Sequence, residues 1–313
     1  MTSQRLMLLD TASLYFRAFF GVPSIEAPDG TPVNAVRGLL EFIARLAEDY
    51  SPTHLVCCWD DDWRPQWRVD LIPGYKAHRV VEEVPAAPDV EEVPDPLAVQ
   101  VPLIREALDA LGITVLGAPE AEADDVIGTL ATGAGMPVEV VTGDRDLFQL
   151  VDDAAGVRVL YTARGVGRHE RVDEAWVVEK YGVRADQYAD FATLRGDTSD
   201  GLPGVPGVGE KTAAVLLQRF GDLAGIRAAA NDEAADLTAA QRRRLLEAGD
   251  YLDVAPRVVA VRRDLPLPRE GFALPAVPRD PVAVEALSEH LNLASPMARV
   301  VDVLRRIGDP SLG

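Results

Sequence analysis

Cysteine, lysine and long apolar runs are scarce in this sequence of 313 residues. Its two cysteines, Cys57 and Cys58, are adjacent, and side chains of neighbouring strand residues point to opposite faces. We therefore expect two unpaired, buried thiols and a cytoplasmic protein. No apolar run of about 18 residues is present, which excludes a membrane-spanning helix. Residues 1–10 lack a basic leader and a cleavage site, so they do not predict a signal peptide.

Positive charge is also scarce, because the formal net charge is −19. Proteins that bind nucleic acid normally present a basic surface to the phosphates, so this charge argues against such a partner. Bound divalent cations would cancel part of the acidic charge locally. A local concentration of basic residues would also answer the objection.

The hydrophobic pattern divides the chain into two parts. Up to residue 171, strands alternate with helices, which predicts an α/β fold with a mostly parallel, doubly wound sheet. The strands are expected at 5–10, 54–60, 113–116, 137–142 and 157–161, and the helices at 35–47, 97–111 and 121–131. Residues 172–313 are predicted to be a mainly helical second unit, with helices at 210–220 and 239–249 and a late strand at 258–262.

Acidic residues stand at the carboxyl ends of three predicted strands: Asp10, Asp60 and Asp144. One such Asp often only caps the next helix, but ligands of open parallel sheets bind beyond this edge. Asp124 lies on the apolar face of the helix that follows Pro119, where a buried acid needs a partner. Its neighbours Glu122 and Asp125 are open to a second interpretation, as acids favoured by the helix dipole.

Nine carboxylates make up the predicted metal site: Asp10, Asp60, Glu122, Asp124, Asp125, Asp144, Asp146, Asp197 and Asp200. In one cleft they would repel one another and raise each other's pKa values, unless hard cations bind them. An all-oxygen set without His or Cys predicts Mg²⁺ or Mn²⁺. Two such ions are typical of phosphodiester hydrolysis.

Two further segments indicate nucleic acid. The glycine-rich stretch with Gly204, Gly207, Gly209, Lys211 and Thr212 precedes an apolar helix and is suited to gripping a phosphate backbone, although a plain turn is the alternative. The segment 63–80 combines four basic residues and one acid with three aromatics. Cations next to stacking rings suit single-stranded nucleic acid, whereas a solvated loop would not need two tryptophans.

These motifs together resemble the bacterial 5′–3′ exonuclease and flap endonuclease family, in the stand-alone form of the 5′-nuclease domain that also precedes DNA polymerase I. The matching stretches are Asp10, Trp59-Asp60, Gly74-Tyr75-Lys76, Glu122-Ala-Asp124-Asp125, Thr142-Gly-Asp144-Arg-Asp146 and Gly196-Asp197-Thr-Ser-Asp200. They occur in family order and cover residues 5–265. Gly201 stands where the family often has Asn, and Arg145 replaces a frequent Lys.

The resemblance implies a PIN-like nuclease core at 1–171 with a helical arch at 63–96. It also implies a helix-three-turn-helix DNA-binding module at 172–313, which includes the C-terminal helices. Lys76, Arg79 and Arg17 would act at the scissile phosphate, and Tyr75 would stack on a base. The nine acids would hold two or three Mg²⁺ or Mn²⁺ ions, and the hairpin at 204–209 would bind K⁺.

The expected activity is metal-dependent hydrolysis of DNA at 5′ flaps and 5′ ends, by a monomer that acts in RNA-primer removal and DNA repair. Two alternatives stay open. One is a PIN-like ribonuclease, against which the glycine hairpin favours duplex DNA. The other is a catalytically silent protein that binds branched DNA, and such a protein has no reason to keep nine acids near phosphates.

Overall fold

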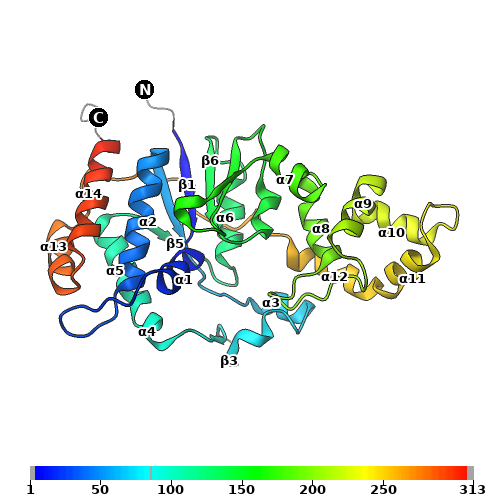
Figure 1. Ribbon diagram of the computed structural model, residues 1–313, viewed down its shortest axis with the longest axis horizontal. Helices are drawn as coiled ribbons and strands as arrows, with labels where there is room; N and C mark the ends of the chain where they lie inside the picture. Colours follow the sequence, from blue (N-terminus) through cyan, green and yellow to red (C-terminus); the bar gives the residue numbers. More distant parts are fainter. Residues whose placement is uncertain (1–3, 85–86, 309–313) are drawn as a thin grey trace.

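The computed structural model describes residues 4–84 and 87–308, and a six-stranded sheet lies at its centre (Figure 1). The strand order is β5-β2-β1-β6-β7-β8, in which the first five strands are parallel and β8 runs antiparallel to β7. The strands are β1 (Leu6–Asp10), β2 (His54–Cys58), β5 (Thr114–Leu116), β6 (Val138–Thr142), β7 (Val157–Tyr161) and β8 (Glu170–Val172). The predicted α/β fold with a mostly parallel sheet is therefore confirmed.

Helices cover both faces of the sheet, which explains why its strands are apolar almost throughout. Along β1, Met7 and Leu9 pack against one layer, while Leu6 and Leu8 pack against the other. The first layer contains α1 (Thr11–Gly21), α2 (Asn34–Tyr50), α5 (Gln100–Leu111), α13 (Pro281–His290) and α14 (Ala294–Gly308). The second layer begins with α6 (Ala123–Ala131).

The second layer continues into the helical unit on the right of Figure 1. Its helices are α7 (Glu174–Tyr181), α8 (Tyr188–Arg195), α9 (Glu210–Phe220), α10 (Leu223–Asn231), α11 (Ala239–Glu247) and α12 (Gly249–Val259). Phe191 and Leu217 of this unit belong to the same apolar cluster as Leu8 and Val140 of the sheet. The sheet and the helical unit are therefore joined by a continuous core.

Two predictions about the second half are wrong. The strand expected at 258–262 is the end of α12 followed by irregular chain. The buried Gln149 side chain binds Val259 O and Val261 N at 3.1 and 3.0 Å, so these backbone groups are satisfied without a strand partner. The sequence predicts that the C-terminal helices α13 and α14 belong to the helical unit, but they pack on α5 and α2 of the first half.

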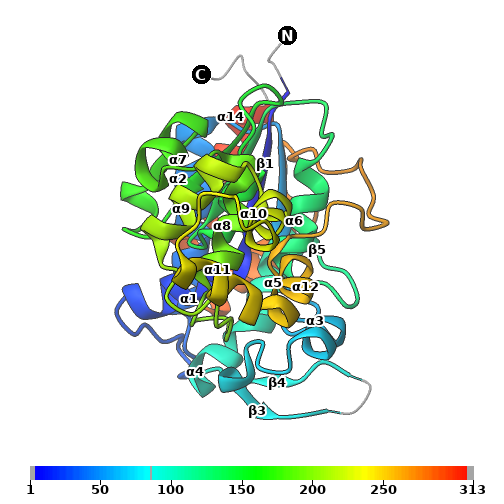
Figure 2. The ribbon, with the colours of Figure 1, turned by 90° about the vertical axis from the view of Figure 1, so that its right-hand side faces the viewer.

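Residues 63–96, called here the clamp segment, cross the molecule beneath the carboxyl edge of the sheet (Figures 1 and 2). The described part contains α3 (Gln66–Leu71), the 3-10 turn Ala77–Arg79, the short antiparallel strands β3 (Val80–Glu82) and β4 (Val90–Glu91), and α4 (Asp95–Ala98). In the described part of the clamp segment the helices are short, because prolines at 65, 73, 88, 94 and 96 interrupt any long helix.

Candidate active site

A cavity of about 350 Å³ lies between the carboxyl edge of the sheet and the clamp segment. Asp10, which ends β1, contributes to its wall together with residues that follow β2 and β6. The predicted site residues that line it are Asp10, Asp60, Lys76, Arg79, Glu122, Asp124, Asp144 and Asp197. The structure therefore brings six of the nine predicted acids together, along with two basic side chains of the clamp segment.

Asp10 is both a helix cap and a cavity residue. Its Oδ1 accepts a hydrogen bond from Ser13 N at 3.1 Å, which caps α1, and its Oδ2 accepts one from the Thr142 hydroxyl at 2.6 Å. Burial, together with the charges of Asp60 and Asp144, raises the pKa of this carboxyl to about 7 against the lowering effect of these hydrogen bonds. A residue that only caps a helix does not need to be buried in a cavity beside other acids.

Asp60 and Asp124 face the same cavity from two elements. Asp60 accepts a hydrogen bond from Ala123 N, the first residue of α6, at 2.8 Å, and burial raises its pKa. Burial also raises the pKa of Asp124 well above its usual range, and the charges of Asp144, Asp10 and Glu122 add to this effect. The ionised forms of these carboxylates are thus disfavoured without a cation.

A second group of acids follows β6 and α8. Asp146 N donates to Asp144 Oδ1 at 2.9 Å, and the buried Oδ1 of Asp146 has no hydrogen-bond partner within the described chain. Burial and the charge of Asp144 raise the pKa of Asp146 well above its usual range. Burial raises the pKa of Asp200 to about 6, although the Lys76 charge opposes this. Asp197 lies 3.3 Å from the Arg195 guanidinium.

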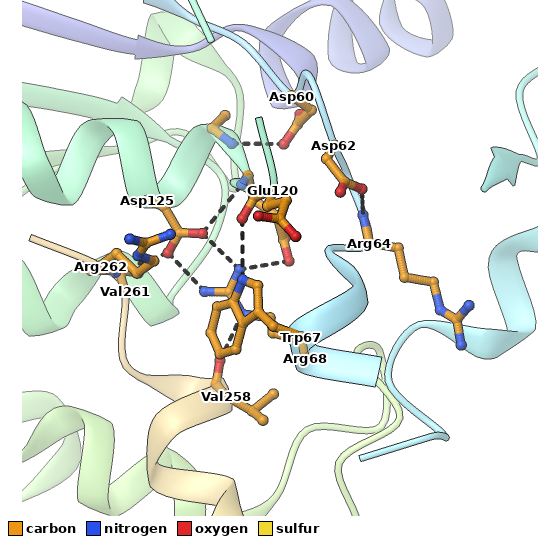
Figure 3. A network of polar contacts seen from close by, with 12 residues as sticks. Asp60, Asp62, Arg64, Trp67, Arg68, Glu120, Asp125, Val258, Val261 and Arg262 are labelled. Carbon is orange, nitrogen blue, oxygen red and sulfur yellow. Dashed lines mark hydrogen bonds and ion pairs between the residues drawn. The ribbon is translucent and has the colours of Figure 1, made fainter. Parts of the chain in front are cut away.

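Asp125 belongs to the buried polar network of Figure 3. It does not line the cavity, so its predicted role as a metal ligand is corrected. Its two oxygens accept hydrogen bonds of 2.7 Å each from the guanidinium of Arg68, and the residue is completely buried. Arg262 N and Glu122 N also donate to it, at 2.9 and 3.2 Å. No local pattern in the sequence indicates this pair, because Arg68 and Asp125 are 57 positions apart.

Glu122 lines the cavity but is already bound by three donors of the clamp segment. Arg68 and the Tyr75 hydroxyl donate to Oε1 at 3.0 and 2.7 Å, and the Lys76 ammonium donates to Oε2. Tyr75 is therefore buried inside the network, and the expectation that its ring stacks on a base does not fit this arrangement. Arg79 donates to Asp200 at 3.2 Å.

Arg17 is the one predicted catalytic residue that does not line the cavity. It projects from α1, and its Nη1 donates to the carbonyl of Ala163 at 3.4 Å. Its Nη2 lies next to Gly143, which does line the cavity. Arg17 therefore does not line the cavity itself but lies next to a residue that does.

The acids fit hard divalent cations by their chemistry. Every donor is a carboxylate oxygen, the pKa values of the buried members are raised by burial and by one another, and the buried Asp146 oxygen lacks a partner in the described chain. Within residues 4–84 and 87–308, no three such side chains are already arranged to coordinate a metal ion. Binding would therefore require small side-chain movements, and the Lys76–Glu122 contact is one that would have to change.

The predicted glycine hairpin joins α8 to α9. Gly204 and Gly207 have φ of +66° and +72°, and a Cβ at Gly204 would come within 2.5 Å of the Arg195 carbonyl oxygen, so glycine is required there. Gly209 precedes α9 without a side-chain cap, and Lys211 in its first turn is exposed, with Thr212 half-buried. Free N–H groups and a nearby cation suit a phosphate.

Several cavity residues were missed from the sequence. Phe16 lines the cavity, and its ring is 6.5 Å from that of Phe20, which is 71% exposed. The spacing of four residues along a helix that begins beside Asp10 was a usable signal. Glu91 also lines the cavity, and nothing local in the sequence indicated it.

Comparison with known proteins agrees with this geometry. The model of the 5′–3′ exonuclease N-terminal resolvase-like domain matches residues 5–182, and that of the 5′–3′ exonuclease C-terminal SAM fold matches residues 183–281. The chain belongs to the 5′–3′ exonuclease family. The boundary between the two matches lies later in the chain than the one predicted at 171.

Curated relatives extend the match over nearly the whole chain. A 5′–3′ exonuclease of Streptomyces coelicolor is 65% identical over 95% of this chain and 99% of its own length. A 5′–3′ exonuclease of Mycobacterium tuberculosis is 52% identical over 96% and 97%. DNA polymerase I of Mycobacterium bovis is 39% identical over 98% of this chain but only 32% of its own length. The predicted family is therefore confirmed.

Solved structures share the fold at low sequence identity. A flap endonuclease of bacteriophage T5, in a complex with DNA and metal ions, matches with a TM-score of 0.64 and 16% identity, over 96% of this chain and 99% of that chain. Human GEN1 in complex with Holliday junction DNA matches with a TM-score of 0.61 and 15% identity, over 95% and 72%. These matches support the PIN-like architecture.

In the described part of the chain, every helix is too short or too polar to cross a membrane, which agrees with the sequence.

Proposed function

We propose that this family member is a structure-specific 5′ nuclease that removes 5′ flaps and 5′ ends from branched DNA with Mg²⁺ or Mn²⁺. The observation that carries the proposal is a cavity of about 350 Å³ that is lined by strand-end acids together with Lys76 and Arg79. Family membership supports the reaction class and the 5′–3′ polarity. The predicted pathway, primer removal and repair, is part of the same proposal.

The proposed metal ligands are the acids that line or adjoin the cavity. Asp10, Asp60, Glu122 and Asp124 would hold one cation, and Asp144, Asp146, Asp197 and Asp200 would serve a second. The chemistry that such ions supply is activation of a water nucleophile and stabilisation of the leaving oxygen. Lys76 and Arg79 would orient the scissile phosphate, since both basic residues line the same cavity as the acids.

The proposed DNA contacts lie on both sides of the cavity. The free amino end of α9, with Gly209 and Lys211, would bind the phosphates of the duplex. Arg244 adds a cation there, because its Nη1 donates to the Gly207 carbonyl at 3.4 Å. The half-buried ring of Phe16 and the exposed ring of Phe20 would stack on bases at the junction. A K⁺ ion at the carbonyls of residues 204–209 belongs to this proposal too.

A time course on a 5′-labelled flap and a matched blunt duplex tests the proposal, with Mn²⁺, Mg²⁺ or EDTA present. We expect metal-dependent release of the flap near the junction and slower shortening of the blunt end. The same flap with a ribonucleotide 5′ segment tests whether primer ends are accepted.

Lack of cleavage in every metal, by a folded protein that still binds the flap, would overturn the proposal in favour of a silent DNA-binding protein. Cleavage of single-stranded RNA in preference to flapped DNA would favour a ribonuclease instead.

A further inference from the structure

One guanidinium joins three parts of the molecule behind the cavity (Figure 3). Arg68 belongs to α3 of the clamp segment and is 2% exposed. Besides its two bonds to Asp125, its Nη1 donates to Glu122 Oε1 at 3.0 Å and its Nε donates to the Val258 carbonyl at 3.1 Å. Arg68 therefore ties the clamp segment to the amino end of α6 and to the carboxyl end of α12.

Asp125 transmits the position of Arg68 to the backbone of α6. Its Oδ2 accepts from both Arg68 and Glu122 N, so the side chain that binds the guanidinium also binds the backbone of the cavity acid. With Arg262 N on Oδ1, the carboxylate has partners on both oxygens and no access to the cavity. Its part in the site is therefore indirect.

The two oxygens of Glu122 have different partners. Oε1 is held by Arg68 and by the Tyr75 hydroxyl, both deep in the protein. Among the described residues, Oε2 is bound only by the Lys76 ammonium, whose residue lines the cavity. A metal cation that enters the cavity can therefore bind Oε2 by displacing the ammonium of Lys76, which ends a flexible side chain. Oε1 meanwhile stays bound to the rigid guanidinium of Arg68.

We propose that Arg68 is a positioning residue, which holds Glu122 by Oε1 so that Oε2 is presented to a divalent cation in exchange for Lys76. The displaced ammonium of Lys76 is then free to meet the substrate phosphate. The inference rests on the proposed function. Residues that orient a metal ligand from behind commonly change metal affinity by roughly 10- to 100-fold when they are replaced.

Manganese binding to the full-length, DNA-free protein tests the inference without relying on cleavage. The concentration of free Mn²⁺ is followed by electron paramagnetic resonance for the wild type, Arg68→Lys and Lys76→Met. We expect Arg68→Lys to weaken binding by roughly 10-fold or more, because an ammonium with three N–H donors cannot make all four bonds that Arg68 makes to Asp125, Glu122 and the Val258 carbonyl. Lys76→Met is expected to tighten binding, since it removes the competing cation.

Arg269→Ala is the matched control. The Arg269 Nη1 donates to the carbonyls of Thr129 and Thr132, at 2.7 and 2.9 Å, at the opposite end of the same helix. This variant loosens α6 without touching a cavity residue, so its Mn²⁺ affinity should stay that of the wild type. Thermal unfolding of each variant shows whether the fold survives.

A double variant separates an indirect role of Asp125 from a direct one. Asp125→Asn should weaken Mn²⁺ binding, and adding Arg68→Lys should weaken it little further, since both changes break one link. If the fold-changes in Mn²⁺ affinity of the two single variants multiply in the double variant, Asp125 contacts the cation itself, and the inference is overturned. If Arg68→Lys does not fold, Asp125→Asn and Lys76→Met still decide.

Cleavage gives a second readout. Single-turnover rates of Arg68→Lys should recover at high Mn²⁺ while its flap affinity in Ca²⁺ stays unchanged. Wild-type Mn²⁺ affinity in folded Arg68→Lys, or weaker binding by Lys76→Met, would refute the role of Arg68 or the exchange. A wild type that neither binds Mn²⁺ nor cuts DNA would refute the proposed function itself.

Discussion

At the residue scale, the cavity acids combine a structural and a chemical position. Asp10 caps α1, and Asp60 accepts from the first N–H of α6, yet both line the cavity. The capping explanation and the metal explanation are thus compatible, because each carboxylate has a second oxygen or lone pair to offer. What distinguishes Asp124 is that it lies within a helix, where it caps nothing.

Replacing Asp124 or Asp144 by Asn should abolish cleavage and leave flap binding nearly intact. Asn keeps the size of the side chain but removes the negative charge that a hard cation requires. Single-turnover cleavage and binding in Ca²⁺ are to be compared for each variant. A near-normal cleavage rate would remove that residue from the metal site.

The raised pKa of Asp10 predicts an inverted pH dependence of stability without metal. The pKa rises from 3.8 to about 7 on folding, so between these values the folded chain keeps a proton that the unfolded chain has released. Stability therefore falls as the pH rises through this window. We expect the urea midpoint in EDTA to be higher at about pH 5 than at about pH 8, and this difference to shrink in Asp10→Asn. An unchanged difference in the variant would show that other groups dominate.

At the element scale, the clamp segment is fixed by the loop between α8 and α9. Lys76 N donates to the Asp200 carbonyl at 3.0 Å, and a Cβ at Gly201 would lie only 2.1 Å from Gly74 O. Gly201 also has φ of +72°, a conformation that glycine and asparagine tolerate best. The close approach and the positive φ explain why this chain has glycine at position 201.

Gly201→Ala should therefore displace the clamp segment and lower the single-turnover rate, with a smaller effect on duplex affinity. The backbone must shift to admit the methyl group, and Lys76 shifts with it. Gly249→Ala is the control, because a Cβ there has no neighbour within 4 Å. Equal rates for both variants and the wild type would show that this contact does not position Lys76.

At the scale of the whole molecule, the two faces of the sheet have separate cores. The cluster on the side of α6 extends into the helical unit, and the other is closed by α13 and α14. Arg299 of α14 also binds Glu41 and Glu48 of α2, at 2.5 and 2.6 Å. The end of the described chain thus completes the layer that begins with α1 and α2.

Met297→Ala should destabilise the protein by about 2–5 kcal/mol, because it leaves a cavity at a side chain that is 1% exposed. Val282→Ala on α13, where the side chain is 76% exposed, should change stability by less than about 0.5 kcal/mol. Urea unfolding at fixed pH and metal concentration measures both. Similar values for the two variants would mean that α14 contributes little to the core.

The sequence by itself determined the sheet, the edge on which the site lies and most of its acids. The carboxyl ends of parallel strands lie at one edge of the sheet. Acids at or just after the ends of β1, β2 and β6 therefore lie close together, whatever conformation the loops adopt. The turn at glycines 204 and 207 could also be predicted from the sequence, because their positive φ is a local requirement. Such features depend on chain periodicity and on neighbouring residues only.

Only the tertiary structure decided which acids face the cavity and which are used elsewhere. Asp124 and Asp125 are adjacent and chemically identical, yet a helix turns them to different partners, and Arg68 comes from the distant clamp segment. The burial of Tyr75, the absence of a strand at 258–262 and the position of α14 likewise depend on contacts between remote parts of the chain. No local pattern encodes such contacts, because they arise from packing.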